Sequence, residues 1–164
     1  MDASIFLALA LKCAPAIHTT TTRALVQVES GFNPWAIGVV GGRLVRQPGT
    51  QAEALATAKA LQNNGWNFSV GLAQINLLNL PRLGLTLESA FDPCSNLRAM
   101  QTVLNDCFSR ATSSGFTPSQ RALRAALSCY YSGDFETGFR HGYVLRVVTT
   151  ASEAGRISTT LIRS

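Results

Sequence analysis

Runs of apolar residues with helical spacing begin close to the N-terminus. The run SIFLALALKC predicts a short buried helix, which Pro15 stops. Thr19 to Thr22 offer N-caps for a second helix, which reaches Ser30 and is closed by Gly31. The first thirty residues are therefore expected to form two helices separated by a short break.

The middle of the chain is punctuated by glycine and proline. The stretch AIGVVGGRLVRQPG has two short β-prone arms around Gly41 and Gly42, which predicts a hairpin. Thr50 and Glu53 have the spacing of a capping box, which predicts a helix over TQAEALATAKALQNN that ends at Gly65. The following WNFSVGLAQINLLNLPRLG is too interrupted for one long helix, so we expect a loop with short helical turns.

Helical spacing returns in the last third of the chain. Pro93 and Gly115 bracket a long helix, and Pro118 opens another that reaches about Tyr130. A last helix is expected over roughly Tyr143 to Ala154. With 164 residues, 46% of them hydrophobic, the chain fits one domain with a substantial core. We expect an α+β, mainly α, domain over residues 1–155 and a frayed tail over 156–164.

The charge pattern is basic but dispersed. The formal net charge is +5, and arginines are scattered from Arg23 to Arg163. This favours a mildly basic surface suited to a polyanionic matrix, and we expect no nucleic-acid groove. The longest apolar opening, IFLALAL, is far shorter than the roughly 20 residues of a membrane span and lacks the flanks of a signal peptide. We expect no transmembrane segment, and an export signal that has been removed.

The four cysteines, Cys13, Cys94, Cys107 and Cys129, have neither a CxxC spacing nor Cys/His metal-ligand spacings. An even number permits disulfides and an oxidising compartment such as the periplasm, with three possible pairings; buried thiols are the alternative. We favour Cys13 with Cys94 and Cys107 with Cys129, since each pair joins two predicted helices or their ends. The second pair requires helices that cross at an angle, because a straight antiparallel hairpin leaves an axial offset of roughly 7 to 8 Å.

Few residues are candidates for chemistry. His18 and His141 lie in no metal-ligand spacing, no nucleotide-binding or nucleophile motif is present, and we expect no metal or cofactor. Glu29 is different, because it ends an apolar helical run. The negative end of the helix dipole and the apolar neighbours both favour its protonated form, which suits a general acid. Taken alone, this position favours an exposed or hydrogen-bonded structural glutamate.

Three blocks, VESGFNP, SVGLAQIN and SCYYSGD, resemble in their order and spacing the signature blocks of the soluble lytic transglycosylases, which share the goose-type lysozyme fold. CAPAIH, AIGVVGGRLVRQP, FDPCSNLRAM and GYVLRVV resemble more narrowly the small transglycosylases of type IV secretion and conjugation systems. The resemblance covers about residues 13 to 150. It implies a lysozyme-like domain with a small β-hairpin beside the cleft, and peptidoglycan as the substrate.

The resemblance also implies the residues of the site. Glu29 matches the catalytic acid, and Tyr130 matches a tyrosine beside it. Tyr131 stands where the family usually has asparagine, and Cys129 where it commonly has a small residue. Tyr143 lies either in the cleft or in the core. The substrate-binding set that we expect is Ser30, Gly71, Leu72, Gln74, Ile75, Asn76, Tyr130, Tyr131 and Tyr143.

In the implied reaction Glu29 protonates the bond between N-acetylmuramic acid and N-acetylglucosamine, and the muramic C6 hydroxyl closes onto the anomeric carbon. The product would be an anhydro-muramic end, made in the periplasm for an envelope-spanning secretion machine. One alternative is a hydrolytic lysozyme in which Asp92 or another acid activates water. Another is a catalytically weak wall-binding or assembly module.

Overall fold

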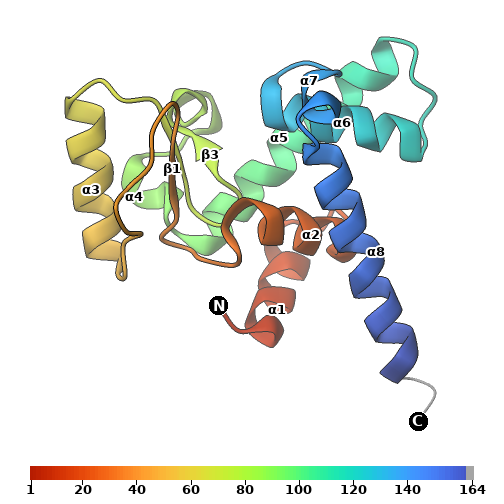
Figure 1. Ribbon diagram of the computed structural model, residues 1–164, viewed down its shortest axis with the longest axis horizontal. Helices are drawn as coiled ribbons and strands as arrows, with labels where there is room; N and C mark the ends of the chain where they lie inside the picture. Colours follow the sequence, from red (N-terminus) through yellow and green to blue (C-terminus); the bar gives the residue numbers. More distant parts are fainter. Residues whose placement is uncertain (162–164) are drawn as a thin grey trace. The chain divides into compact units, whose positions relative to one another are not determined.

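The chain folds into two compact units, Met1–Met100 and Gln101–Ser164. The computed structural model describes the backbone of residues 1–161 and the side chains of residues 1–154. It is mainly helical with one small antiparallel sheet, which confirms the expected fold class (Figure 1). The elements of the first unit are α1 (Ala3–Cys13), α2 (Thr19–Ser30), β1 (Ile37–Val39), α3 (Gln51–Asn63), β2 (Phe68–Val70), β3 (Ile75–Asn76), the 3-10 turns η1 (Leu77–Asn79) and η2 (Pro81–Leu83), and α4 (Leu87–Ala90). Helix α5 (Pro93–Ser113) contains the boundary, and α6 (Gln120–Ser132), α7 (Thr137–Arg140) and α8 (Tyr143–Leu161) follow it.

Helix α1 is less buried than its sequence predicts. Only Phe6, Ala10 and Cys13 are buried, whereas Ile5 and Leu11 are more than half exposed. The reason is geometric, because positions spaced by three and four residues share one face of a helix. The buried residues of α1, which packs against α2, have this spacing. The prediction of a buried helix was therefore wrong for its remaining apolar positions.

The N-cap of helix α2 lies one residue before the expected threonine caps, and the helix begins at Thr19. His18 is the N-cap, and its Nδ1 accepts a hydrogen bond from the backbone N–H of Thr20 at 3.3 Å. At the other end Gly31 is left-handed with φ +58°, and its N–H bonds to the Gln27 carbonyl, as expected for a glycine C-cap. Leu25 is fully buried, so α2 is anchored to the core next to its C-terminal turn.

The sheet has the order β1-β2-β3, with both pairs antiparallel. The hairpin expected around Gly41 and Gly42 was wrong: β1 pairs with β2, with Ile37 opposite Val70, and no second strand follows Gly42 before α3 in this described segment. The side chain of Gln47 takes that place. Its Oε1 accepts from the Ile37 N–H at 2.8 Å, and its Nε2 donates to the Ile37 carbonyl at 2.9 Å. One side-chain amide thus pairs with the backbone N–H and carbonyl of Ile37 at the outer edge of β1.

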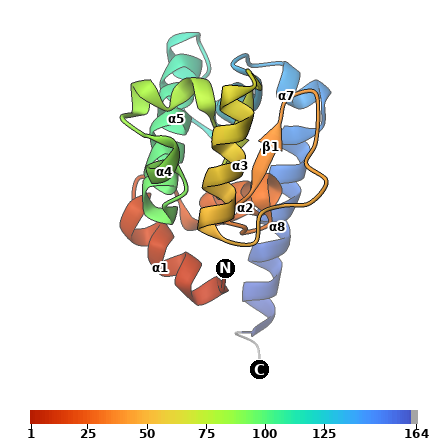
Figure 2. The ribbon, with the colours of Figure 1, turned by 90° about the vertical axis from the view of Figure 1, so that its left-hand side faces the viewer.

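The stretch expected to be a loop with helical turns contains two strands as well. β2 and β3 are joined by residues 71–74, and η1 and η2 supply the helical turns that follow. Sequence periodicity missed the strands because they are only three and two residues long. Figure 2 shows β1 and α3 of this unit from another side.

Helix α3 begins at half of the expected capping box. The Thr50 hydroxyl accepts from the Glu53 N–H at 3.2 Å. The Glu53 carboxylate reaches past Thr50 to the Gly49 N–H at 2.8 Å and pairs with Arg46. The bond from Gly49, followed by that from Arg46, lowers the pKa of Glu53 below its usual value. The loop before α3 is therefore tied to the helix start.

In the second unit α6 packs against α7 and α8. Ser119 caps α6, which starts two residues after Pro118, and Gly133 ends it. Gly138 of α7 lies so close to α6 that an added Cβ would fall 2.6 Å from the Ser128 Cα. Helix α8 extends past the expected end at Ala154 to Leu161. Residues 162–164, the end of the tail expected over 156–164, lie outside the described residues.

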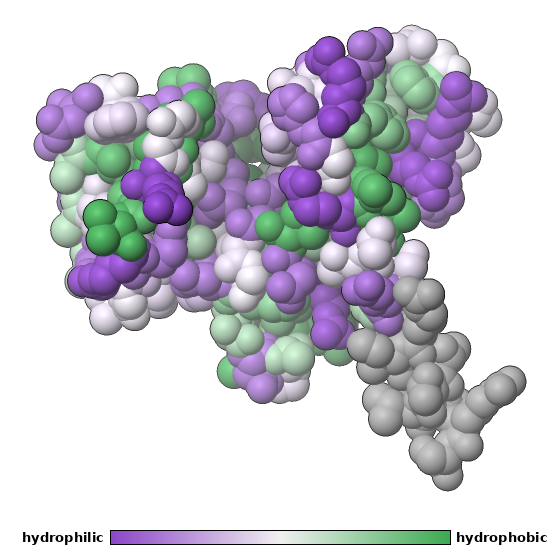
Figure 3. Space-filling model, in the orientation of Figure 1, coloured by the Kyte–Doolittle hydropathy of each residue, from purple (hydrophilic) through white to green (hydrophobic). Residues whose placement is uncertain are grey.

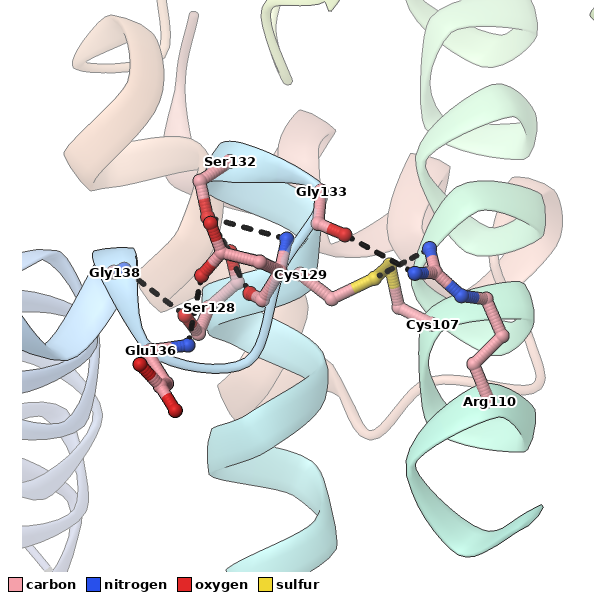
Figure 4. The surroundings of a disulfide bond; sticks show 9 residues. Cys107, Arg110, Ser128, Cys129, Ser132, Gly133, Glu136 and Gly138 are labelled. Atoms are coloured by element: carbon pink, nitrogen blue, oxygen red, sulfur yellow. Dashed lines mark hydrogen bonds between the residues drawn. A yellow bond between two sulfur atoms is a disulfide. The ribbon is translucent and has the colours of Figure 1, made fainter. Parts of the chain in front are cut away.

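The four cysteines pair as favoured from the sequence. Cys13 and Cys94 have Cα atoms 5.3 Å apart, and Cys107 and Cys129 have Cα atoms 5.7 Å apart. Figure 4 shows the second bridge between α5 and α6. Beside it the Arg110 guanidinium donates to the Cys129 sulfur at 3.3 Å and to the Gly133 carbonyl at 3.1 Å. The bridge and this arginine together fasten the end of α6 to α5.

Removing the α5–α6 bridge is expected to lower the free energy of unfolding. The two cysteines are 22 residues apart in sequence, and closing a loop of that length removes about 3 kcal/mol of chain entropy from the unfolded state. The double variant Cys107→Ala/Cys129→Ala should lose about that amount in urea unfolding. An unchanged urea midpoint would contradict this contribution of the bridge.

Candidate active site

Glu29 is the penultimate residue of α2 and lies half-buried at the C-terminal end of the helix. The residues that precede it on the inner face, Leu25 and Val26, have no exposed surface. This is the position that the sequence predicts for a carboxyl placed between the core and the surface. Its catalytic role stays a prediction.

Ser30 ties this helix end to the turn between β2 and β3. Its hydroxyl donates to the Leu72 carbonyl at 2.7 Å, with the Val26 carbonyl as a second acceptor at 3.3 Å. Leu72 and Ala73 are themselves fully buried, so the acceptor is held by the core. Ser30, the residue next to Glu29, is thus fixed to this turn.

That turn is held by Asn96, a residue that the sequence analysis did not single out. Asn96 is fully buried on α5 and makes its contacts within the first unit. Its Nδ2 donates to the carbonyls of Val70 at 3.0 Å and Ala90 at 2.8 Å, and its Oδ1 accepts from the Ala73 N–H at 2.8 Å. A polar residue among the apolar positions of FDPCSNLRAM was the signal that could have revealed it.

Gly71 fits this turn for steric reasons. Its φ is +81°, and an added Cβ would lie 2.3 Å from the Asn96 Nδ2 and 3.0 Å from the Ala90 carbonyl oxygen. The sequence analysis placed Gly71 in the expected substrate-binding set, and that role stays a prediction. In the structure the backbone at Gly71 packs closely against Asn96.

Gln74 is fixed by the backbone around it. It has a positive φ of +49°, and its Nε2 donates to the carbonyls of Ala36 at 3.1 Å and Gly71 at 3.0 Å. Its Oε1 lies over Gly38, where an added Cβ would be 2.5 Å away. Both amide hydrogens are therefore used within the protein, which leaves the oxygen as the group with which Gln74 could accept a bond from a sugar hydroxyl.

Asn76 and Ile75 also have structural roles. The Asn76 Oδ1 accepts from the Leu78 N–H at 3.0 Å and caps η1, and its Nδ2 donates to the Asn67 Oδ1 at 2.9 Å. Ile75 is 2% exposed and belongs to the core, as does Leu72. In this segment the expected binding residues Leu72 and Ile75 are buried in the core. The side-chain amides of Gln74 and Asn76 form hydrogen bonds within the protein.

The expected tyrosines lie in the second unit. Tyr131 is exposed, stacks on Tyr143 with ring centroids 4.6 Å apart, and has its hydroxyl 3.2 Å from the His141 Nδ1. Tyr143 is only 2% exposed, so the structure favours its core alternative. Tyr130 is half-buried on α6, and its role beside the acid stays a prediction. Tyr131 stands where the resemblance implies an asparagine, and its phenol forms a hydrogen bond with the His141 side chain.

The carboxylate of Asp134 organises the start of α7 in this unit. It accepts from the Thr137 N–H and hydroxyl, both at 2.7 Å, and from the Glu136 N–H at 2.8 Å. These bonds, those of Thr137 first, lower the pKa of Asp134 from 3.8 to about 2.

Because the folded-state pKa of Asp134 is lowered, its stabilising contribution is present above the unfolded value of 3.8 and is lost as the pH falls toward 2. We expect an NMR titration of its carboxyl carbon to have a midpoint at about 2. A midpoint near 3.8 would show that the Thr137 bonds do not form in solution.

Asp92, the acid of the lysozyme alternative, is an N-cap. Its Oδ1 accepts from the Ser95 N–H at 2.8 Å at the start of α5.

Within the described residues no group of three or more histidines, cysteines or acids could hold a metal ion. None of the helices in the described part of the chain has the length and apolar character of a membrane span. Figure 3 shows polar and apolar residues interspersed on the face that it presents.

This arrangement of a helix-terminal glutamate, a serine tether and a glycine turn coincides with a family match. The chain belongs to the transglycosylase SLT domain family, which it matches over residues 6–144. It is 54% identical over 151 residues to the type IV secretion system protein virB1 of Brucella suis biovar 1 (strain 1330), covering 89% of this chain and 63% of that protein. It is 36% identical over 146 residues to the protein virB1 of Agrobacterium fabrum (strain C58 / ATCC 33970), covering 88% of this chain and 58% of that protein.

The chain therefore spans less than two thirds of the length of these curated relatives. No solved structure gives a significant match to it.

Proposed function

We propose that this protein is a peptidoglycan lytic transglycosylase with Glu29 as its acid and base. The observation that carries the proposal is the position of Glu29, half-buried at the end of α2, next to a serine bound to the β2–β3 turn. A carboxyl at the negative end of a helix dipole and beside buried aliphatic groups is suited to hold a proton near neutral pH. Membership of the transglycosylase SLT domain family supports the same role.

The proposed reaction has two proton transfers through one carboxyl. Glu29 first gives its proton to the glycosidic oxygen between N-acetylmuramic acid and N-acetylglucosamine, and the bond from that oxygen to the anomeric carbon breaks. An oxocarbenium-like or substrate-assisted intermediate forms. The Glu29 carboxylate then takes the proton of the muramic C6 hydroxyl while the C6 oxygen bonds to the anomeric carbon. Glu29 is protonated again, and the product is a 1,6-anhydro end.

The other acids of the first unit support an internal nucleophile over water. This unit has five acids, Asp2, Glu29, Glu53, Glu88 and Asp92. Asp2 caps α1, Glu53 is held by Gly49 and Arg46, and Asp92 caps α5. The remaining acid, Glu88, is exposed in the first turn of α4. A hydrolase usually requires a second carboxylate to activate or replace water. The muramic C6 hydroxyl needs no such partner, since it is tethered to the reacting sugar and is entropically favoured.

We further propose that the enzyme acts in the periplasm, where it opens the wall for a type IV secretion or conjugation apparatus. The names of the virB1 relatives, one of which is called a type IV secretion system protein, support this role. The two disulfides fit an oxidising compartment. Expression of this chain, fused to an export signal, in an Agrobacterium strain that lacks virB1 should restore type IV-dependent transfer. A failure to restore transfer by an exported and active protein would contradict this assignment.

The activity itself is tested with purified peptidoglycan. The protein should release soluble glycan fragments from isolated sacculi in a concentration-dependent manner. Sacculi that stay intact in the presence of the folded, disulfide-bonded protein would favour the wall-binding alternative.

A further inference from the structure

We propose that Asn96 is a positioning residue for the acid Glu29, acting through the β2–β3 turn and Ser30. This inference rests on the proposed transglycosylase function and names a residue that acts on that same site without touching the substrate. It is carried by one continuous set of hydrogen bonds inside the first unit, from a buried amide to the residue next to the acid.

The first link is the amide of Asn96 itself. It is fully buried, and it bonds to three backbone groups: the carbonyls of Val70 and Ala90, and the N–H of Ala73. A primary amide offers two donor hydrogens and an acceptor oxygen, which is what these three groups require. An aliphatic residue of the same size would leave three buried backbone groups without these bonds.

The second link is the contact between Asn96 and Gly71. The Asn96 Nδ2 occupies the space that a Cβ on Gly71 would need, since the two would be 2.3 Å apart. Gly71 also has a φ of +81°, which only glycine adopts without strain. The amide and the glycine therefore define the shape of the turn together.

The third link leads to the acid. The turn presents the Leu72 carbonyl, which accepts the 2.7 Å hydrogen bond from the Ser30 hydroxyl. Ser30 follows Glu29 in the last turn of α2. A shift of the turn would therefore move the acceptor that holds the end of this helix. Because a misplacement of about 1 Å can cost about 100-fold in rate, we expect the effect mainly in kcat.

Replacing Asn96 with aspartate makes this role visible as a pH dependence. An ionised aspartate still accepts from the Ala73 N–H, but it sets a carboxylate oxygen against the carbonyls of Val70 and Ala90. A protonated aspartate can donate to one of them. Burial raises the pKa of such a carboxyl, so the protonated form that restores the turn gains population as the pH falls. The activity of Asn96→Asp relative to wild type should rise in the same direction.

The test measures kcat and KM on soluble peptidoglycan fragments between pH 8 and pH 5 for the full, disulfide-bonded protein. For Asn96→Asp we expect kcat relative to wild type to rise by about tenfold or more as the pH falls, with KM unchanged. The matched control is Asn64→Asp, which alters an exposed amide bonded to the Ala60 carbonyl at the end of α3. Its kcat relative to wild type should stay constant across this range.

A second variant tests the other end of the same path. Ser30→Ala removes the bond to the Leu72 carbonyl and should lower kcat about tenfold or more with KM unchanged. A kcat ratio for Asn96→Asp that does not change with pH would overturn the inference. If Asn96→Asp does not fold at any pH, a wild-type kcat for Ser30→Ala would overturn it. Inactivity of the wild-type protein would instead contradict the proposed function.

Discussion

The variant Glu29→Gln should keep the fold and lose turnover of peptidoglycan by about 100- to 10,000-fold, the range expected when a general acid is removed. Glutamine has nearly the same shape as glutamate but cannot deliver a proton to the glycosidic oxygen. Leu25 and Val26, which anchor this end of α2, are unchanged by the substitution. The same variant should still bind glycan strands, because binding does not require the proton.

The measurement is the release of soluble fragments from sacculi, together with a sedimentation assay for bound protein. Glu88→Gln is the matched control, because Glu88 is an exposed acid in the first turn of α4 in the same unit. It should retain wild-type turnover. A Glu29→Gln protein whose turnover stays within a few-fold of wild type, with contaminating enzymes excluded, would show that Glu29 is not the acid.

Gly71→Ala should lower the free energy of unfolding by about 2 to 5 kcal/mol, the sum of two costs. A non-glycine residue in the left-handed region costs about 1 to 2 kcal/mol. Overpacking a filled interior costs about 1 to 3 kcal/mol more, and here the Cβ would meet the Asn96 amide at 2.3 Å and the Ala90 carbonyl oxygen at 3.0 Å. Since the Ala90 oxygen belongs to the backbone, the clash cannot be relieved by a rotamer change alone.

Gly84→Ala separates these two costs. Gly84 has a φ of +67°, but an added Cβ there would have no neighbour within 4 Å. This control should lose only about 1 to 2 kcal/mol. Both variants are compared with wild type by urea unfolding at neutral pH. Equal losses for Gly71→Ala and Gly84→Ala would mean that the turn does not pack against Asn96 in solution.

The helices could be predicted from the sequence because their signals are local. Gly31 closes α2, Thr50 caps α3 and Gly133 ends α6 through contacts with nearby residues alone. The hairpin prediction failed because strand pairing is not local. Gly41 and Gly42 do form a turn, but β1 pairs with a strand about thirty residues away, and the Gln47 side chain satisfies its free edge.

The site was predictable to the level of its segments. VESGFNP and SVGLAQIN are brought together by the bond between Ser30 and Leu72. That both segments line a glycan cleft stays a prediction. The structural roles of Gln74 and Asn76 within SVGLAQIN were not predictable from the sequence. The amide hydrogens of Gln74 bond to backbone carbonyls, and the Asn76 amide donates to the Asn67 side chain. Asn96 was missed for the same reason, since a satisfied buried amide is recognisable only once its partners are placed.

We propose that the muramic C6 hydroxyl, and not water, attacks the anomeric carbon after Glu29 has protonated the leaving oxygen. The most direct test is mass analysis of the muropeptides that the wild-type protein releases from purified peptidoglycan, before and after borohydride treatment. We expect products that end in anhydro-muramic acid, lighter by one water than lysozyme products and unchanged by borohydride. Predominantly reducible muramic ends would contradict attack by the C6 hydroxyl and would support the hydrolytic lysozyme alternative.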